Sequence, residues 1–95
     1  MTIVYSTELL DHLADYLQYI KDASGKVAAQ KFQKALFEDI RLIGIYPLMY
    51  RKSLYFNDRN IRDITFKGYV VIYKIDKGKC TVLIMGKHKN WWYKP

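Results

Sequence analysis

The sequence predicts an α+β domain with the element order β-α-α-β-β-β, in which a helical hairpin packs on one face of a mainly antiparallel sheet. Two observations lead to this prediction. Apolar residues recur at intervals of three and four in the first half of the chain, the period of amphipathic helices. The second half holds three β-favouring runs separated by glycine-containing turns. The 95 residues suit one domain, so we expect residues 1–95 to form a single unit.

Residues 2–5 form the first element, because the run Thr-Ile-Val-Tyr favours a β-strand. Ser6 and Thr7 then supply N-cap candidates for a helix that begins at Glu8. Its apolar residues follow the helical period, and Ser24-Gly25 marks its end. These apolar residues are Leu10, Leu13, Leu17 and Ile20.

A second helix follows with the same period and with alanines beside its apolar face. Its apolar residues are Phe32, Leu36, Ile40 and Ile43. Pro47 cannot continue a helix, so the helix ends before it and the two helices are expected to form a hairpin. Residues 47–60 have mixed polarity and are interpreted as a loop in which Leu54-Tyr55-Phe56 is pinned to the body of the domain.

Three β-type runs follow this loop. In residues 61–66 the side chains of Arg62, Ile64 and Phe66 share one face of the strand, while the alternate residues share the other. Lys67-Gly68 predicts a tight turn into the next run.

Residues 69–75 are apolar on both faces, as expected for a central strand covered by helices on one side. The segment Asp76-Lys77-Gly78-Lys79 carries a glycine suited to a hairpin turn. Residues 81–85 then complete the antiparallel sheet, and Gly86 is expected to end the last strand.

The composition favours a cytoplasmic domain that folds without disulfides or a structural metal. Hydrophobic residues make up 51% of the chain and aromatic residues 16%, which is enough apolar area for a core. Cys80 is the only cysteine, so neither an internal disulfide nor a cysteine-based zinc site is expected. No apolar run approaches the ~18 residues that cross a bilayer, and the first residues lack a signal-peptide pattern. We expect no metal and no cofactor.

The charge is distributed unevenly along the chain. Residues 1–50 carry five Lys/Arg against six Asp/Glu, and residues 51–95 carry eleven against three, so that −1 and +8 give the net +7. This asymmetry indicates a polyanionic or acidic partner for the C-terminal half, either nucleic acid or an acidic protein segment. Surface charge kept for solubility is the alternative.

The tail is the segment that stands out for chemistry, because the sequence contains no GxGxxG, Walker loop, GxSxG or HExxH motif. In the tail, cations alternate with large aromatic residues. It contains Lys87, His88, Lys89, Trp91, Trp92, Tyr93 and Lys94. Cations contact phosphates and aromatic rings stack on bases, so the tail suits RNA or single-stranded nucleic acid. Alternatively, the tryptophans cap the core while the lysines stay in solvent.

Four further side chains, one in the tail and three elsewhere, are considered for a catalytic or binding role. His88, beside lysines and a tyrosine, is a candidate proton acceptor. Arg62 is either a phosphate ligand or, as we favour, a partly buried arginine paired with a carboxylate. Lys67 could approach a phosphate from its turn, although a turn lysine is usually solvated. His12 lies on the polar side of the first helix and is expected to be plain surface.

The order and spacing of these segments resemble the RelE/ParE toxin superfamily of bacterial type II toxin–antitoxin modules over nearly the whole chain. The segments that carry the resemblance follow the helical hairpin. They are Ile61-Arg62-Asp63-Ile64, Gly68-Tyr69-Val70-Val71-Ile72-Tyr73-Lys74-Ile75, and Val82-Leu83-Ile84-Met85 followed by Gly86-Lys87-His88-Lys89. The resemblance implies a helical hairpin packed on a sheet and a toxin held inactive by an antitoxin.

The resemblance also implies one of two targets. RelE-like members cleave mRNA on the ribosome without metal, whereas ParE-like members poison DNA gyrase without an established catalytic site. In the cleaving branch an arginine that holds the scissile phosphate follows the Gly-Tyr pair, and here that position is Val70. His88 stands at the basic position after the last strand, and Tyr93 falls near the tail tyrosine of the cleaving branch.

We therefore predict a toxin that a cognate antitoxin neutralises through an acidic segment, with the ParE-like gyrase target slightly preferred. In that case Lys67, Lys87, Lys89, Trp91, Trp92 and Lys94 would contact the target. The alternative is a ribosome-dependent, metal-independent mRNA endonuclease in which His88, Tyr93 and Arg62 are catalytic. A second alternative is a degenerate, non-toxic nucleic-acid-binding or regulatory module.

Overall fold

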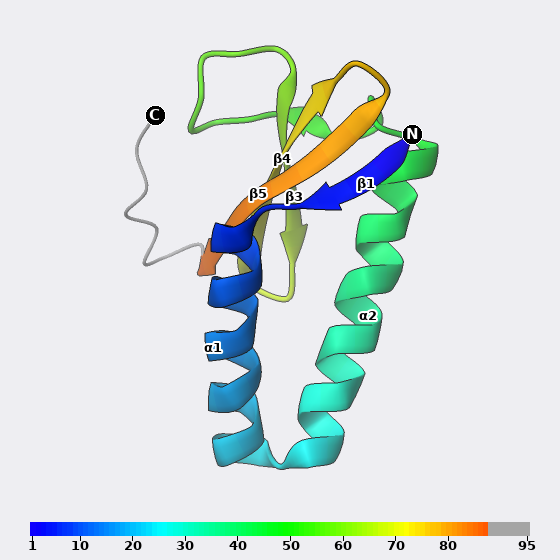
Figure 1. The fold of residues 1–95 in the computed structure, drawn as a ribbon. Helices are drawn as coiled ribbons and strands as arrows, with labels where there is room; N and C mark the ends of the chain where they lie inside the picture. The colour runs from blue at the N-terminus through cyan, green and yellow to red at the C-terminus, as the bar shows by residue number, and fades with distance from the viewer. Residues whose placement is uncertain (88–95) are drawn as a thin grey trace.

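Residues 1–87 of the chain are described by a computed structural model, in which two helices pack on one face of a sheet (Figure 1). The elements in chain order are β1 (Thr2–Tyr5), α1 (Thr7–Ser24), α2 (Lys26–Ile45), β2 (Arg51–Lys52), β3 (Ile61–Phe66), β4 (Tyr69–Asp76) and β5 (Lys79–Lys87). The predicted α+β class and the helical hairpin are confirmed. The loop between the helices lies at the end of the hairpin that is farthest from the sheet (Figure 1).

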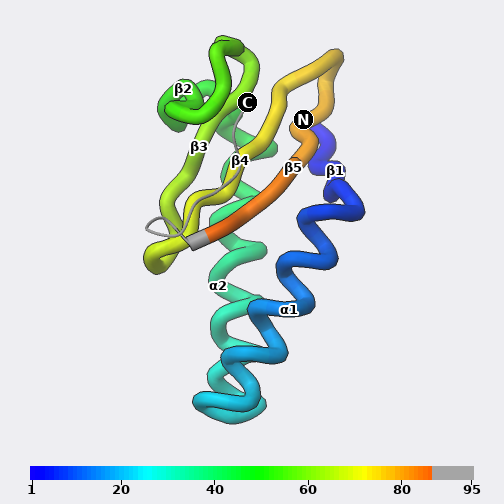
Figure 2. Tube along the Cα trace, turned by 90° about the vertical axis from the view of Figure 1, so that its left-hand side faces the viewer, coloured from blue at the N-terminus to red at the C-terminus, as the bar shows by residue number. Residues whose placement is uncertain are grey.

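The sheet has five strands in the order β1-β5-β4-β3-β2, which Figure 2 shows nearly in sequence across the view. The pairs β2–β3, β3–β4 and β4–β5 are antiparallel, and only β1 pairs in parallel, with β5. The prediction of a mainly antiparallel sheet is therefore confirmed. The central strand is β4, whose first five residues are buried, because one face meets the helices and the other a second apolar cluster.

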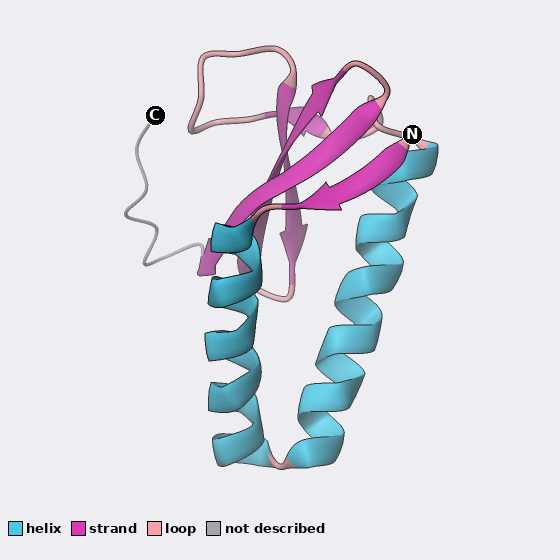
Figure 3. Ribbon diagram, viewed as in Figure 1, coloured by secondary structure: helices cyan, strands magenta, loops and turns pink. Residues whose placement is uncertain are grey.

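Local sequence signals set the start of α1 and the break between the two helices. The Ser6 hydroxyl caps α1 by accepting a hydrogen bond from the Leu9 N–H at 3.0 Å, and it donates to the Leu83 carbonyl at 2.5 Å. The same side chain thus ties the start of α1 to β5. Gly25 separates the helices with φ at +95°, a backbone conformation that residues with a Cβ rarely adopt. Figure 3 shows the short connection at this point.

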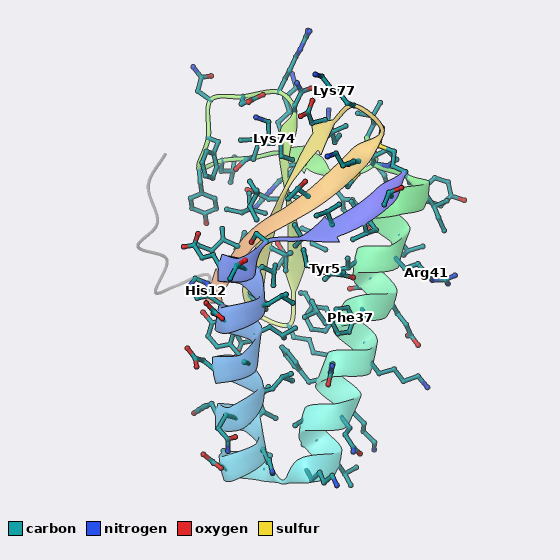
Figure 4. The ribbon with its side chains drawn as sticks, viewed as in Figure 1. Tyr5, His12, Phe37, Arg41, Lys74 and Lys77 are labelled. Carbon is teal, nitrogen blue, oxygen red and sulfur yellow. The ribbon has the colours of Figure 1, made fainter. Side chains whose placement is uncertain are left out.

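The end of α2 lies against the start of the chain. The N-terminal ammonium of Met1 donates to the Gly44 carbonyl at 2.7 Å. A Cβ at Gly44 would lie 2.9 Å from the Met1 carbonyl oxygen, so the approach needs a glycine. Tyr5 of β1 and Phe37 of α2 meet edge to face with their ring centroids 5.6 Å apart (Figure 4). These contacts fix β1 between α2 and β5.

The sheet carries an apolar cluster on each face. The larger cluster fills the space between helices and sheet and includes Leu9, Leu36, Ile40, Val71 and Tyr73. The smaller cluster lies on the face away from the helices. It consists of Ile61, Val70, Ile72 and Ile84, with Tyr55, Phe56 and Leu83 packed against it. Residues from the 47–60 segment therefore cover part of the outer face, which keeps a two-sided apolar strand out of water.

Three details differ from the sequence-based predictions. The segment 47–60 is not entirely loop, because β2 pairs with β3 inside it. Leu54 was expected to be pinned to the body but is 70% exposed, whereas its neighbours Tyr55 and Phe56 do pack inward. Gly86 does not end the last strand. It stays paired with Val70, and β5 runs on through Lys87, because partners on β4 remain available to it.

Candidate target-binding surface

Two of the predicted binding residues lie at one end of the sheet, where β3 turns into β4. Lys67 and Gly68 both have positive φ, +48° and +83°, which matches the twist of a two-residue hairpin turn. The exposed Lys67 side chain places Nζ 5.5 Å from the centroid of the Phe66 ring. Tyr69 pairs with Phe66 on one side and with Lys87 on the other, so the backbone of Lys87 ends beside this turn.

The remaining predicted tail residues lie outside the described part of the chain. They are His88, Lys89, Trp91, Trp92, Tyr93 and Lys94. Their roles in catalysis or target binding stay predictions. The last described residue, Lys87 at the end of β5, lies at the same end of the sheet as Lys67.

The outer face of the sheet is apolar at Val70, the position at which the resemblance implies a phosphate-binding arginine in the mRNA-cleaving branch. Val70 is completely buried there, in one cluster with Ile61, Ile72 and Ile84. A valine in such a cluster offers neither a charge nor a hydrogen bond to a phosphate. The buried valine supplies packing energy in place of a phosphate ligand.

Arg62 lies on the helix-facing side of β3, opposite Tyr73 of β4. Its Nη1 donates to the Tyr50 carbonyl at 2.7 Å and to the Leu48 carbonyl at 3.3 Å. These contacts support the structural role favoured for this arginine, although among residues 1–87 its partners are backbone carbonyls and not the expected carboxylate. Two backbone carbonyls accept from its Nη1 instead, because the turn after α2 brings them within reach. Its catalytic role stays a prediction.

The next residue, Asp63, makes its contacts on the opposite face of the sheet. Asp63 is 2% exposed, and its Oδ2 accepts a hydrogen bond from the Leu54 N–H at 3.0 Å. Arg51 on the neighbouring strand places Nη2 3.8 Å from the same oxygen. Adjacent residues of a strand point to opposite sides, so Asp63 cannot reach the Arg62 guanidinium. This carboxylate instead holds the start of the 53–60 segment, a role that the sequence did not reveal.

His12 is not the plain surface residue that its helix position suggested. Its Nδ1 lies 3.2 Å from the Met85 carbonyl oxygen, and Figure 4 shows the residue on α1 beside the end of β5. Tyr16, one turn further on, donates to the same carbonyl at 3.4 Å and packs on the Tyr69 ring at 4.9 Å. Burial raises the pKa of both tyrosines above the usual value, so their hydroxyls remain protonated donors. The contacts join α1 to the last strand.

The chain just after α2 displays exposed apolar side chains, two of them in the segment 47–60 that the sequence predicts to be a loop. Tyr46, Leu48 and Met49 are each more than half exposed. Underneath them, the Tyr73 hydroxyl donates to the Pro47 carbonyl at 2.6 Å. An apolar Leu-Met pair directly after a helix-ending proline was the available signal, but only the structure shows that these side chains face outward.

A shallow groove of about 360 Å³ runs between the helices near their connection. Its walls combine small apolar and amide side chains with two lysines. They are Ala14, Leu17, Gln18, Lys21, Lys26, Ala29, Gln30 and Gln33. In residues 1–87, no group of three His, Cys, Asp or Glu side chains could hold a metal ion. Within the same range, no helix is long and apolar enough to span a membrane.

Together these features define a small basic α+β domain whose surfaces suit a macromolecular partner. Residues 3–90 match the family model described as "ParE toxin of type II toxin-antitoxin system, parDE". The chain therefore belongs to the ParE toxin family, which confirms the expected resemblance and its ParE-like branch. No curated protein matches the sequence.

A solved structure agrees in fold with this assignment. It is titled "Chromosomal ParDE TA system from P. aeruginosa" and superposes with a TM-score of 0.77. The match covers 92% of this chain and 95% of that chain at 10% sequence identity. At this identity the likeness concerns the fold alone, and it extends over almost the entire domain.

Proposed function

We propose that this protein is the toxin of a type II module, that it arrests growth by binding DNA gyrase in the cytoplasm, and that a cognate antitoxin neutralises it. The observation that carries the choice of target is the burial of Val70 in an apolar cluster. Together with membership of the ParE toxin family, it favours inhibition by binding over cleavage of mRNA.

Phosphodiester cleavage needs groups that stabilise charge on the reacting phosphate. Loss of one such donor commonly costs about 10²–10³ in rate. Val70 supplies no such donor, and Nη1 of Arg62 already donates to the Leu48 and Tyr50 carbonyls. Val70 thus serves the packing of the sheet, and Arg62 helps to hold the turn after α2. A protein that binds gyrase requires no such donor at either position.

The proposed partner that neutralises the toxin is an antitoxin with an acidic segment. The C-terminal half carries +8, and this charge would attract a negatively charged segment before any close contact forms. Much of it lies on exposed side chains of the sheet and its turns, among them Lys52, Lys67, Lys74, Lys77 and Lys79. The same positive charge would also favour binding to DNA held by gyrase. The antitoxin and the target would therefore compete for the same basic surface.

The test uses the purified protein in two parallel assays. In the first, gyrase supercoils relaxed plasmid in the presence of increasing toxin. In the second, actively translating ribosomes receive the toxin, and mRNA 5′ ends are mapped by primer extension. We expect supercoiling to be blocked, or cleaved DNA to be trapped on gyrase, and no new mRNA ends.

A His88→Ala variant serves as the internal control for both assays. New mRNA ends that disappear in this variant would overturn the gyrase proposal and establish cleavage despite Val70. Inhibition of gyrase that persists in the variant would support action by binding. If neither assay responds, the chain is a non-toxic binding module.

A further inference from the structure

The end of α2 carries a cluster of exposed apolar side chains. Half of the ten large apolar side chains that are exposed among residues 1–87 lie there, with exposed fractions between 52% and 69%. They are Met1, Ile45, Tyr46, Leu48 and Met49, and they are here called the α2-end surface. Met1 belongs to it because its ammonium is bound to the Gly44 carbonyl. Apolar side chains gathered in one place on a surface mark an interaction site.

Buried polar groups hold the backbone of this surface from below. The Tyr73 hydroxyl donates to the Pro47 carbonyl at 2.6 Å, and Arg62 donates to the carbonyls of Leu48 and Tyr50. A further bond, from the Met49 N–H to the Tyr46 carbonyl at 3.1 Å, closes the turn itself. The apolar side chains are therefore displayed on a backbone that is already ordered. A partner that binds there loses little free energy to ordering the turn.

Exposed cations surround the α2-end surface. On the α2 side Arg41 projects away from the helix (Figure 4), and Arg51 and Lys52 follow the turn. On the β1 side, Thr2 pairs with Lys79 and donates to the Gly78 carbonyl, which brings the Lys77–Lys79 turn next to Met1. Three carboxylates are also near. Oδ2 of Asp63 lies 3.8 Å from Nη2 of Arg51, Asp76 pairs with Lys79 in the sheet, and Asp39 adds to the rise that burial causes in the pKa of Tyr50.

The charges around the α2-end surface help to decide which kind of partner binds there. A second copy of this chain would bring the same cations against each other, which opposes self-association. Nucleic acid would meet the cations, but it would leave the apolar centre without a matching surface. An acidic protein segment with apolar anchors satisfies both, because its carboxylates face the cations and its apolar side chains cover the centre.

We propose that the α2-end surface docks a segment of the antitoxin in which carboxylates flank two or more large apolar side chains. This inference rests on the proposed function, and it adds the place at which neutralisation occurs and the chemistry of the bound segment. Leu48 and Met49 are its apolar anchor points, and Lys52 is part of its cationic rim.

The experiment measures binding of the toxin to the product of a small acidic reading frame adjoining its gene. Leu48→Glu and Met49→Glu place a charge on exposed positions, so the fold should persist, and circular dichroism checks this. Each is expected to weaken binding about 30-fold or more, as for an interface hot spot. Lys52→Glu is expected to weaken it by a smaller factor, since rim charges contribute less than the centre.

Two variants on the hairpin serve as matched controls. Val27→Glu changes an equally exposed apolar residue near the start of α2, at the far end of the hairpin from the α2-end surface, and Lys34→Glu changes an exposed cation of α2. Both should bind like the wild type. If Val27→Glu weakens binding while Leu48→Glu does not, the docking site lies near the connection between the helices and the present proposal is overturned.

Growth in cells separates this inference from the proposed function. When expressed without antitoxin, both the wild-type toxin and the Leu48→Glu variant should arrest growth. Co-expressed antitoxin should restore growth only with the wild-type toxin. If the wild type neither binds nor is rescued, neutralisation by this partner fails together with the docking site. If Leu48→Glu is rescued as well as the wild type, only the docking site fails. Loss of arrest in a folded Leu48→Glu that still binds antitoxin would assign the surface to the target instead.

Discussion

Arg62 and Asp63 are neighbours in sequence, yet they stabilise different parts of the molecule. The arginine faces the helices and holds the turn after α2, while the carboxylate faces outward and holds Leu54. Each also has one buried atom without a hydrogen-bond partner in the described structure, Nε of Arg62 and Oδ1 of Asp63. Unpaired buried polar atoms cost stability. The pair therefore contributes to the placement of two segments rather than to a large gain in stability.

Replacing Arg62 by lysine should destabilise the fold by about 1–3 kcal/mol, because an ammonium cannot reproduce the guanidinium geometry and leaves a carbonyl unsatisfied. Urea unfolding of the two proteins measures the difference. Arg59→Lys, at an exposed position, is the control and should stay within about 0.5 kcal/mol of wild type. Equal midpoints for Arg62→Lys and wild type would show that the two carbonyl contacts contribute nothing measurable.

Tyr73 should make the stability of the protein sensitive to alkaline pH. Burial raises the pKa of its hydroxyl well above the ordinary value of 10.0. Below that value the residue is protonated in folded and unfolded chains alike, and its contribution is complete. Above it only the unfolded chain loses the proton, so stability falls as pH rises, by up to about 1.4 kcal/mol per pH unit for one tyrosine.

Urea midpoints between neutral and strongly alkaline pH test this dependence. Tyr73→Phe should be less stable at neutral pH, by about 1 kcal/mol for the lost hydrogen bond, and should decline less steeply in alkali. Tyr5, Tyr16, Tyr50 and Tyr69, whose pKa values burial also raises, leave a residual slope. Tyr46→Phe removes an exposed hydroxyl and should keep the wild-type slope. Parallel slopes for Tyr73→Phe and wild type would contradict the assignment.

At the scale of elements, the packing of α2 against β1 depends on the absence of a side chain at Gly44. In most exposed helix interiors an alanine would be better than glycine by up to about 1 kcal/mol. Here its Cβ would lie 2.9 Å from the Met1 carbonyl and 3.2 Å from Ile3. Contacts this close require backbone movement.

Gly44→Ala is therefore expected to destabilise the protein by about 1–3 kcal/mol, as overpacking does, despite the better helix propensity of alanine. Thermal and urea unfolding measure the change. Lys34→Ala, on the exposed face of the same helix, is the comparison and should be nearly neutral. A Gly44→Ala protein as stable as Lys34→Ala would mean that α2 can move away from β1 without cost.

At the scale of the whole molecule, the uneven charge should act on the rate of association with an acidic antitoxin. The half of the chain with +8 forms most of the sheet, and the half with −1 forms β1 and the helices. The charge thus becomes a spatial asymmetry once the chain folds. Electrostatic steering depends on such a field and weakens as salt shortens its range.

Raising the ionic strength from about 0.05 M to 0.5 M should lower the association rate constant with the antitoxin about tenfold and change the dissociation rate constant much less. Stopped-flow or surface-based kinetics across this range measures both. A combined Lys77→Glu and Lys79→Glu variant should reduce the salt dependence. An association rate that does not respond to salt would show that apolar contact alone governs the encounter.

The sequence predicted the fold better than it predicted individual contacts. The helix bounds follow from periodicity, Gly25 and Pro47, and the hairpin turns follow from Gly68 and Gly78, all of which are local signals. The partner of Arg62, the burial of Asp63 and the contact of His12 with Met85 were not predicted. Each joins residues from different elements, and a single sequence gives no direct signal for such a pairing.

The sequence by itself determined the α+β class, the hairpin, the central strand and the resemblance to the toxin superfamily, because periodicity, turn residues and charge act over short stretches of chain. Only the tertiary structure decided that Val70 is sealed in an apolar cluster, and that Leu48 and Met49 face outward. The physical reason is that burial depends on what the rest of the chain places against a residue. The Pro47–Tyr50 turn is set by Arg62 and Tyr73, which lie in strands further along the chain.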